Sequence, residues 1–409
     1  MKHLPLGIFA SMCVVSSAIA NDKPINSYAI SYPAKTLSQS LSLSSQNTLE
    51  ERQYAIASMQ NYTESLAQNV GIKISSRLKT LAPISFADLT AEQAQVMRNQ
   101  GMLVEKLSYK YLIQPENILP GLEIKAEDPI VIAAETRPWG IRRVQAPGSW
   151  GRSQGNGIKV CIIDTGIDRD HPDLDNNFVR GVNTYFGGSP EDGNGHGTHV
   201  AGTIAAEKNT FGVVGVAPKA KLHIAAAFSP FGFSSDQAIL SALDWCVSQN
   251  TRVINMSYGG GSSTQAEANA YRSAYNAGVV MVAATGNSGA GVPISYPARY
   301  PWTIAVGATN QGNGVASFSQ RGPQIDVVAP GVNVLSTAIG GGTTTLSGTS
   351  MATPHVTGAV ANLLKFRPNL GVEAVRRALR NNALNLGSPG FDNASGSGLI
   401  RINRTLNNL

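Results

Sequence analysis

The stretch that decides the fold is GIKVCIIDTGID, residues 157–168. Its unbroken apolar run, 160–163, is typical of a strand covered on both faces, and Asp164 ends the run. Alternating strands and helices predict a doubly wound α/β fold, a mainly parallel sheet with helices on both faces and a site at the carboxyl ends of the strands. The other strand-like runs are 222–228, 253–256, 279–284, 303–306 and 325–329, and helical stretches between them include 235–249 and 264–277.

The composition indicates a globular protein of more than one domain. Its 409 residues are 42% hydrophobic and 14% charged, enough to bury a sizeable core. The net charge of +6 lies entirely in residues 134–409, which contain 21 Lys and Arg against 15 Asp and Glu. These arginines are scattered and no aromatic residues interleave them, which indicates a solvated basic surface and no nucleic-acid partner.

Residues 1–20 have the pattern of a secretory signal peptide. Lys2 precedes an apolar stretch at 4–19, and Ala18 and Ala20 form an A-x-A-like cleavage site. The stretch is too short and too interrupted for a membrane span, and no later run reaches ~18 apolar residues. We therefore expect a secreted protein, extracellular or periplasmic, with no membrane partner.

Residues 21–133 predict a small α+β domain ahead of a larger domain at 134–409. Thr90 and Gln93 have the spacing of a capping box, which begins a helix. The order βαββαβ is that of a split βαβ, ferredoxin-like domain, and a Pro-rich acidic segment at 114–129 is the expected linker. The strand-like runs are 28–32, 72–81, 84–89 and 102–109, with a further helix at 48–69.

Two cysteines, Cys161 and Cys246, remain once the signal peptide has been removed with Cys13. In an oxidising compartment they can form one disulfide. Their apolar surroundings, a strand and an amphipathic helix, favour two buried free thiols. The sequence leaves both alternatives open.

Three short motifs contain an acid, a base and a hydroxyl nucleophile. Asp164 lies in IDTGID, His196 in GHGTHV and Ser350 in GTSMATPH, and glycines in each motif let backbone or substrate approach closely. Three such groups from separate segments are the parts of a catalytic triad. The order Asp, His, Ser, with Ala352 two residues after the serine, argues against an α/β-hydrolase esterase, which runs Ser, acid, His and has Gly there.

The motifs resemble those of the subtilisin-like serine proteases, from about residue 138 to residue 400. The resemblance implies a subtilisin-like fold and a serine endopeptidase in which His196 takes the proton of Ser350 and Asp164 holds the imidazole. It also implies that Asn287 and the backbone N–H of Ser350 stabilise the oxyanion, where loss of one donor lowers the rate ~10²–10³-fold in subtilisin itself. We expect Pro354 in the first turn of the helix that Ser350 opens.

Two further histidines, His199 and His355, are expected to be buried structural residues, because His-x-x-His without a third ligand is a weak metal signal.

The resemblance implies that the substrate backbone binds as an added strand between two segments near residues 231–233 and 257–260. Small, uncharged residues are expected to line the specificity pocket, which favours bulky apolar side chains or a broad preference. The expected substrate-binding residues are Gly232, Phe233, Ser257, Tyr258, Gly259, Ala283 and Gly286.

A Ca²⁺ site is also implied, residue by residue. Side-chain and carbonyl oxygens of this kind suit a hard cation, and the alternative is an ordinary loop without an ion. The implied ligands are Glu135, Asp173, Glu207, Asn209, Phe211 and Val213, the third, fifth and sixth through their carbonyl oxygens.

The domain at 21–133 resembles the family's pro-region, which assists folding and then inhibits as a bound product. We expect a cut near Ala133, because the sequence from Glu135 resembles the start of mature enzymes. The expected function is therefore a secreted, monomeric endopeptidase that acts on proteins and peptides and activates itself by cleavage. Two alternatives are a non-proteolytic binder that cuts itself once and keeps its pro-region, and a transpeptidase.

Overall fold

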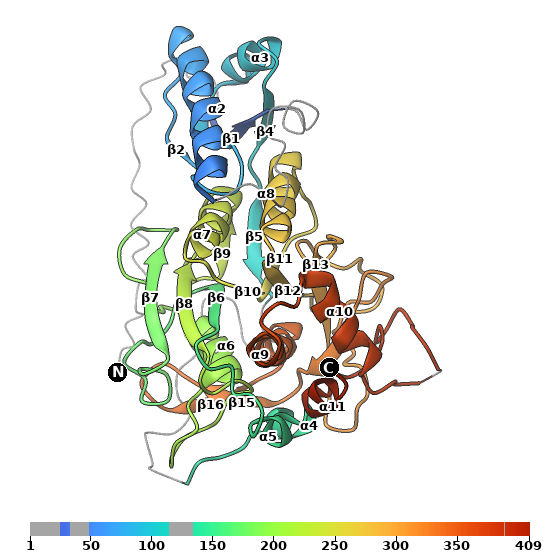
Figure 1. Cartoon of the computed structure of the whole chain (residues 1–409). Coiled ribbons are helices and arrows are strands. Elements are labelled where there is room, and N and C mark those ends of the chain that lie inside the picture. Colours follow the sequence, from blue (N-terminus) through green and yellow to red (C-terminus); the bar gives the residue numbers. More distant parts are fainter. Residues whose placement is uncertain (1–24, 33–48, 114–133, 388) are drawn as a thin grey trace, which may run out of the picture.

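The computed structural model describes residues 25–32, 49–113, 134–387 and 389–409. The expected signal peptide, 1–20, and the expected linker, 114–129, lie outside the described residues. The described part of the chain forms a large sheet covered by helices, with a smaller domain packed on one side of it (Figure 1).

The large sheet has seven parallel strands in the order β14-β13-β12-β10-β6-β8-β7. All six predicted strands are present. The seventh, β7 (Phe178–Asn183), was not predicted because it is partly exposed and has no apolar run. The others are β6 (Lys159–Asp164), β8 (Lys221–Ala226), β10 (Val253–Met256), β12 (Val280–Ala284), β13 (Thr303–Thr309) and β14 (Val327–Pro330).

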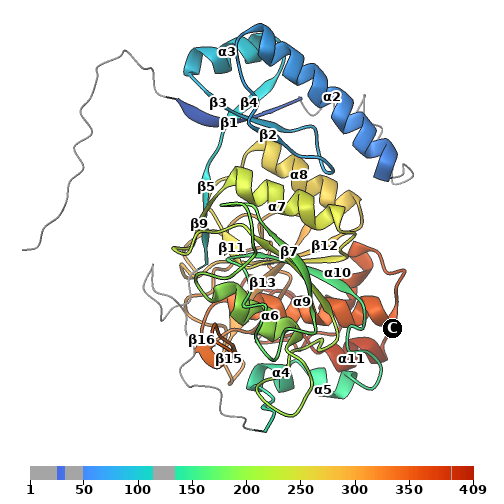
Figure 2. The ribbon, with the colours of Figure 1, turned by 90° about the vertical axis from the view of Figure 1, so that its left-hand side faces the viewer.

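Helices cover both faces of this sheet, as predicted (Figure 2). Side chains of β6 alternate, because successive residues of a strand point to opposite faces. Val160 and Ile162 pack in the core with α6 (His196–Ala205) and α9 (Thr349–Phe366). The intervening Cys161 and Ile163 pack with α7 (Asp236–Ser248) and α8 (Gln265–Asn276). The fold is therefore the doubly wound α/β fold that the apolar runs predicted.

Shorter elements complete the larger part. They are α4 (Trp139–Arg143), α5 (Ala146–Ser149), α10 (Val372–Asn381), α11 (Ile402–Asn407) and the hairpin of β15 (Val334–Thr337) and β16 (Thr343–Leu346).

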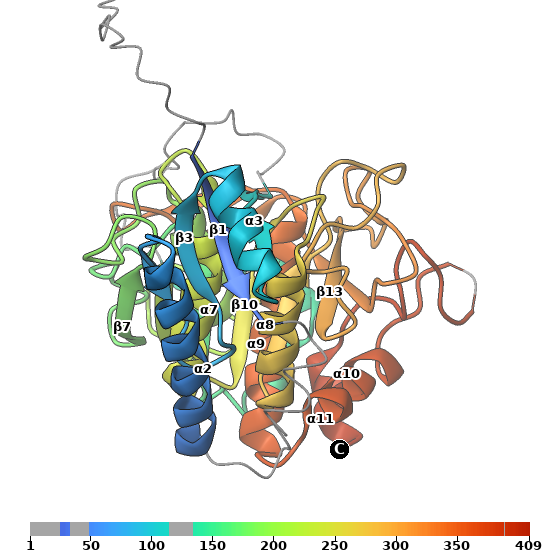
Figure 3. The same cartoon turned by 90° about the horizontal axis from the view of Figure 1, so that it is seen from above.

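The smaller domain has the predicted order βαββαβ and an antiparallel sheet, β2-β3-β1-β4. The capping box is confirmed: Gln93 N donates to Thr90 Oγ1 (3.2 Å), and Thr90 N donates to Gln93 Oε1 (3.0 Å). The run predicted at 72–81 forms only a two-residue strand. This domain lies over α7 and α8 (Figure 3). Its elements are β1 (Asn26–Ser31), α2 (Leu49–Asn69), β2 (Ser76–Arg77), β3 (Ser85–Leu89), α3 (Ala91–Asn99) and β4 (Leu103–Lys106).

Cys161 and Cys246 form a disulfide, so the preference for two free thiols was wrong. Both residues are fully buried, as that interpretation required. The pleat of β6 turns Cys161 toward α7, where the Cα atoms of the two cysteines are 5.8 Å apart, within the range that a disulfide bridges. This proximity across 85 residues of sequence arises only from packing.

Candidate active site

The site begins where β6 ends and α6 begins. Asp164 is the last residue of β6 and His196 the first residue of α6, and both side chains are fully buried. His196 Nδ1 lies 2.7 Å from Asp164 Oδ1, which also accepts a hydrogen bond from the N–H of Thr165 (2.8 Å). The carboxylate thus fixes the orientation of the imidazole ring through Nδ1, and Nε2 is the ring nitrogen that Asp164 does not contact. Among the described residues, that nitrogen has no hydrogen-bond partner.

Ser350 is the second residue of α9, a helix that packs against α6. Its hydroxyl lies 2.8 Å from the carbonyl oxygen of Ile113 and 3.0 Å from that of Ser257, and donates to these oxygens rather than to His196. A catalytic hydrogen bond to histidine is commonly absent before the reacting complex forms.

Pro354 was expected in the first turn of α9, and this prediction was wrong. Pro354 is the sixth residue of the helix. A proline there cannot donate to the carbonyl of Ser350, four residues earlier. The hydroxyl of Ser257 donates to that carbonyl instead (3.0 Å). The proline inside the helix is thus tolerated, because the Ser257 hydroxyl, just after β10, donates the hydrogen bond that the proline nitrogen cannot.

Asn287 follows β12 and faces the start of α9. Its Oδ1 accepts hydrogen bonds from the N–H and the hydroxyl of Thr349, both at 2.9 Å. A Cβ at Gly348 would lie 2.9 Å from Asn287 Nδ2, so only glycine fits there without displacing this amide. The structure therefore brings the side-chain N–H₂ of Asn287 beside the backbone of the Ser350 turn.

A strand of the smaller domain's segment lies in the expected substrate groove. β5 (Tyr109–Leu112) pairs antiparallel with both β9 (Phe233–Ser235) and β11 (Tyr258–Gly259), as Figure 2 shows. Leu112 N donates to Gly232 O at 2.8 Å. Ile113 N contacts the carbonyl of Ser257 at 3.4 Å, which places the Ile113 carbonyl at Ser350. Ile113 was not among the predicted site residues, because its place in the site depends on the pairing of β5 with β9 and β11 and not on a local motif.

The side chain of Ile113 is buried against the expected specificity pocket. A Cβ at Gly259 would lie 3.3 Å from Ile113 Cδ1 and 2.7 Å from Ser295 Cβ, so the missing side chain makes room for both. Ala283 is buried within β12, and Gly286 N donates to the hydroxyl of Thr349 (3.2 Å).

The expected cation loop is assembled around Asp173. Asn209 Nδ2 donates to Asp173 Oδ1 and Val213 N donates to Asp173 Oδ2, both at 2.8 Å. Burial raises the pKa of the Asp173 carboxyl, because desolvation outweighs these hydrogen bonds. Glu135 N donates to Thr210 O (3.2 Å), and among the described residues the buried Oε2 of Glu135 has no hydrogen-bond partner.

The remaining ligands of that loop lie beside these residues. Glu207 N donates to Asp173 O (2.9 Å), and the Glu207 carboxylate accepts hydrogen bonds from Asn176. Phe211 bridges to Ala134, next to Glu135. No group of three or more His, Cys, Asp and Glu side chains in the described ranges is placed to hold a metal, so a site here would need amide and carbonyl oxygens in addition to its carboxylates.

His199 and His355 are fully buried, as expected for structural histidines. His199 Nε2 lies 3.0 Å from Val334 O, and His355 Nδ1 lies 2.9 Å from Met351 O. Burial lowers the pKa of His199 to about 3 and that of His355 to about 4, so both are neutral at pH 7.

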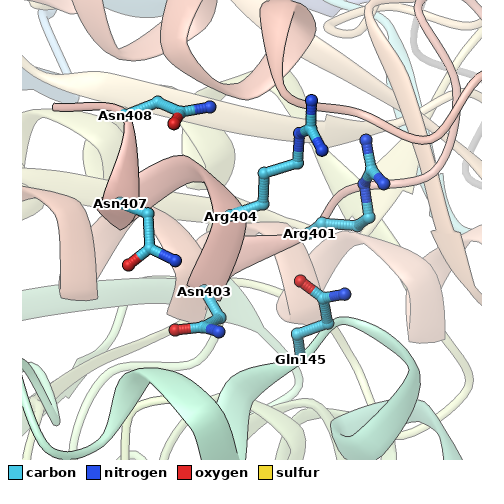
Figure 4. A pocket seen from close by; sticks show the side chains of 6 residues that line it. All are labelled: Gln145, Arg401, Asn403, Arg404, Asn407 and Asn408. Atoms are coloured by element: carbon cyan, nitrogen blue, oxygen red, sulfur yellow. The ribbon is translucent and has the colours of Figure 1, made fainter.

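A separate polar pocket of about 400 Å³ involves none of the predicted site residues (Figure 4). Its guanidinium groups belong to Arg401 and Arg404. Arg401 donates to the carbonyls of Asn382 and Ala383, so it is committed to holding the backbone and we assign no ligand to the pocket.

The Subtilase family profile matches residues 155–398. The chain belongs to the Subtilase family. This subtilase is 48% identical over 280 residues to an alkaline protease of Alkalihalobacillus alcalophilus. The aligned region covers 68% of this chain and 72% of that protein. It is 49% identical over 270 residues to Subtilisin Savinase of Lederbergia lenta, 65% of this chain and 97% of the relative.

Another relative matches a larger share of the chain. Subtilisin amylosacchariticus of Bacillus subtilis subsp. amylosacchariticus is 40% identical over 332 residues, 76% of this chain and 85% of that protein. The subtilase is therefore a serine endopeptidase, as the three motifs predicted. No helix in the part of the chain that the structure describes is long and apolar enough to cross a membrane.

Proposed function

We propose that this subtilase is a secreted endopeptidase, made as a precursor, that activates itself by cutting its own chain. The position of Ile113 carries the proposal, because its carbonyl oxygen lies 2.8 Å from Ser350 Oγ. The strand that ends there is paired on both sides, as an extended substrate is in β-augmentation. Secretion follows from the expected signal peptide.

In this proposal Ser350 is the nucleophile and His196 the general base. The hydroxyl turns from Ile113 O to His196 Nε2, which takes its proton as Oγ attacks the carbonyl carbon. His196 then delivers the proton to the leaving amine as the C–N bond breaks, and a water activated by His196 hydrolyses the acyl-enzyme. Asp164 stabilises the imidazolium through its 2.7 Å contact with Nδ1.

Two N–H groups serve the oxyanion in the same proposal. The backbone N–H of Ser350 lies in the first turn of α9, where no intrahelical acceptor exists. The amide of Asn287 is oriented by Thr349, which holds Oδ1 and so turns Nδ2 to the other side. Donors fixed before the reaction stabilise the developing charge without reorganisation.

The first bond cut is Ile113–Gln114, twenty residues before the cut expected near Ala133. Support comes from the hydrogen bond between Ser350 and the Ile113 carbonyl. A cut near Ala133 is then a later event that removes residues 114–133 from the mature chain.

The smaller domain acts as the inhibitor of the site that cuts it. Three backbone N–H groups, of Lys79, Thr80 and Leu81, donate to the carboxylate of Asp244 at 2.7–2.8 Å. The carboxylate of Glu105 accepts hydrogen bonds from the N–H groups of Gln265 and Ala266, at the start of α8, where the helix dipole also favours an anion. These contacts hold β5 in the groove after the bond is cut.

A time course of intact mass on the purified full chain, followed by a casein digest, tests the proposal. We expect a product that begins at Gln114 to form first, and casein to be digested once the smaller domain has been released. A single cut without casein digestion would favour the non-proteolytic binder, and a first product that begins near residue 134 would contradict the assigned bond.

The loop around Asp173 fits Ca²⁺, because it offers a buried carboxylate whose pKa burial raises and an uncompensated carboxylate oxygen on Glu135. Asp173, Asn209 and Glu135 would hold the ion with the carbonyls of Glu207, Phe211 and Val213. The ion would neutralise charge that is otherwise buried and would tie the segment before α4 to the loop. Its role is in stability and not in chemistry.

Removal of Ca²⁺ is expected to lower the melting temperature of the mature enzyme. A hundredfold excess over Kd stabilises by about 2.7 kcal/mol, which corresponds to roughly 5–10 °C for a domain of this size. Asp173→Asn should melt at the lower temperature with and without chelator, measured by calorimetry. Asp175→Asn, an exposed neighbour, should keep the response, and a wild type that melts identically in chelator and in Ca²⁺ would exclude the site.

A further inference from the structure

Lys110 in β5 is buried, although lysine is among the residues least often buried. Its side chain is 1% exposed, and Nζ lies 3.0 Å from Glu267 Oε2 and 3.4 Å from Asp236 Oδ1. Nζ also donates to the carbonyl of Ser262 at 2.9 Å. The ammonium therefore enters a pocket built for a cation.

The acidic groups of that pocket belong to the catalytic part of the chain. Asp236 is the first residue of α7, and Glu267 lies in the first turn of α8, where the dipoles of both helices favour negative charge. Both side chains are at most 1% exposed. The second oxygen of Asp236, Oδ2, accepts hydrogen bonds from the N–H (2.8 Å) and hydroxyl (2.9 Å) of Ser108.

The pocket offers more carboxyl oxygens than Lys110 satisfies. Two carboxylates face one ammonium, and among the described residues Asp236 Oδ1 and Glu267 Oε1 have no hydrogen-bond partner. Burial raises the pKa of Glu267 to about 7, and the charge of Asp236 adds to that increase while Lys110 opposes it. A buried carboxylate that loses its cation is costly, so an apolar side chain in this pocket is disfavoured.

The position of Lys110 along the strand relates the pocket to substrate recognition. Ile113 presents the carbonyl at Ser350, so Lys110 is the fourth residue before the bond that is cut. Tyr109 and Tyr111 are exposed, whereas Lys110 and Leu112 point inward, as the period of two of a strand requires. A substrate bound in the same register places its own fourth residue in the same pocket.

We propose that the pocket formed by Asp236 and Glu267 selects a basic side chain, lysine or arginine, at the fourth substrate residue before the scissile bond. The inference rests on the proposed function, because it takes β5 as the path of the substrate. Arginine fits as well as lysine, since a guanidinium offers five N–H donors to carboxylate oxygens that the lysine ammonium leaves without a hydrogen bond.

Chromogenic peptides based on residues 110–113 test this inference on the enzyme processed from the full chain. The series Xaa-Tyr-Leu-Ile-p-nitroanilide has Lys, Arg, Met or Glu as its first residue, and active-site titration sets the enzyme concentration. We expect kcat/KM for the Lys and Arg peptides to exceed that for the Met peptide about 10- to 100-fold, the size of one charged hydrogen bond at a buried site. The Glu peptide should be the poorest substrate.

The isosteric variants Glu267→Gln and Asp236→Asn should each lower the Lys-to-Met ratio toward one, because the Lys peptide loses a charged partner and the Met peptide no longer faces that carboxylate. Hydrolysis of the Met peptide, with the active-site titre, reports that either variant is folded and active. Glu373→Gln, an acid on α10 outside the pocket, should keep the wild-type ratio. Equal kcat/KM for the Lys and Met peptides in the wild type would overturn this inference and leave the proposed function intact. No hydrolysis of any peptide would overturn the proposed function as well.

Discussion

Ser350→Ala is expected to abolish proteolysis, with a loss in kcat of about 10⁶-fold, the value established for subtilisin itself. In the proposed mechanism Ser350 Oγ forms the acyl-enzyme, and the substitution removes that atom. The residual rate, ~10³–10⁴-fold above the uncatalysed reaction, comes from oxyanion stabilisation and binding. The purified variant should remain a folded, uncut precursor with β5 in the groove, because the contacts of Asp244 and Glu105 are unaffected.

Intact mass over time and digestion of casein measure this result. Ser248→Ala is a matched control, since that hydroxyl at the end of α7 donates only to the carbonyl of Trp245 within the same helix. The control should process and digest normally. Normal self-cleavage of purified Ser350→Ala would refute the role of Ser350 as nucleophile.

Asp164→Asn is expected to lower kcat by about 10⁴-fold while KM changes little, a loss of the size that this substitution causes in other serine proteases with the same triad. The buried carboxylate accepts from His196 Nδ1 and from the N–H of Thr165. An asparagine that keeps the hydrogen bond from Thr165 N–H places its amide oxygen where Oδ1 lies, and therefore also toward Nδ1. A neutral amide oxygen does not stabilise an imidazolium as a carboxylate does. Catalysis falls although the shape of the site is retained.

Steady-state kinetics on titrated enzyme separates kcat from KM for this variant. Asp168→Asn is the appropriate comparison, because it lies in the same IDTGID motif but accepts a hydrogen bond from Gly340 N outside the site. Its kinetics should match those of the wild type. A wild-type kcat in Asp164→Asn would show that the short contact with His196 has no part in the reaction.

Much of the fold was predictable because burial on both faces leaves a direct trace in the sequence. The six mostly apolar runs correspond to β6, β8, β10, β12, β13 and β14, whereas the partly exposed β7 has no such trace. Thr90 predicted the start of α3 for a local reason, since a capping box is made within four residues. Pro354 was misplaced because the donor that compensates for it, Ser257, comes from another element.

The sequence by itself determined the doubly wound fold and the chemical class of the site, because apolar runs and short motifs are local properties of the chain. Only the tertiary structure decided which cysteine faces α7, which carbonyl lies at Ser350 and which acids surround Lys110. Each of these depends on strand pairing between segments more than 80 residues apart or on the face of a strand that a helix covers. Strand register and packing determine such contacts, and both depend on the burial of many side chains from distant segments. No single motif therefore predicts them.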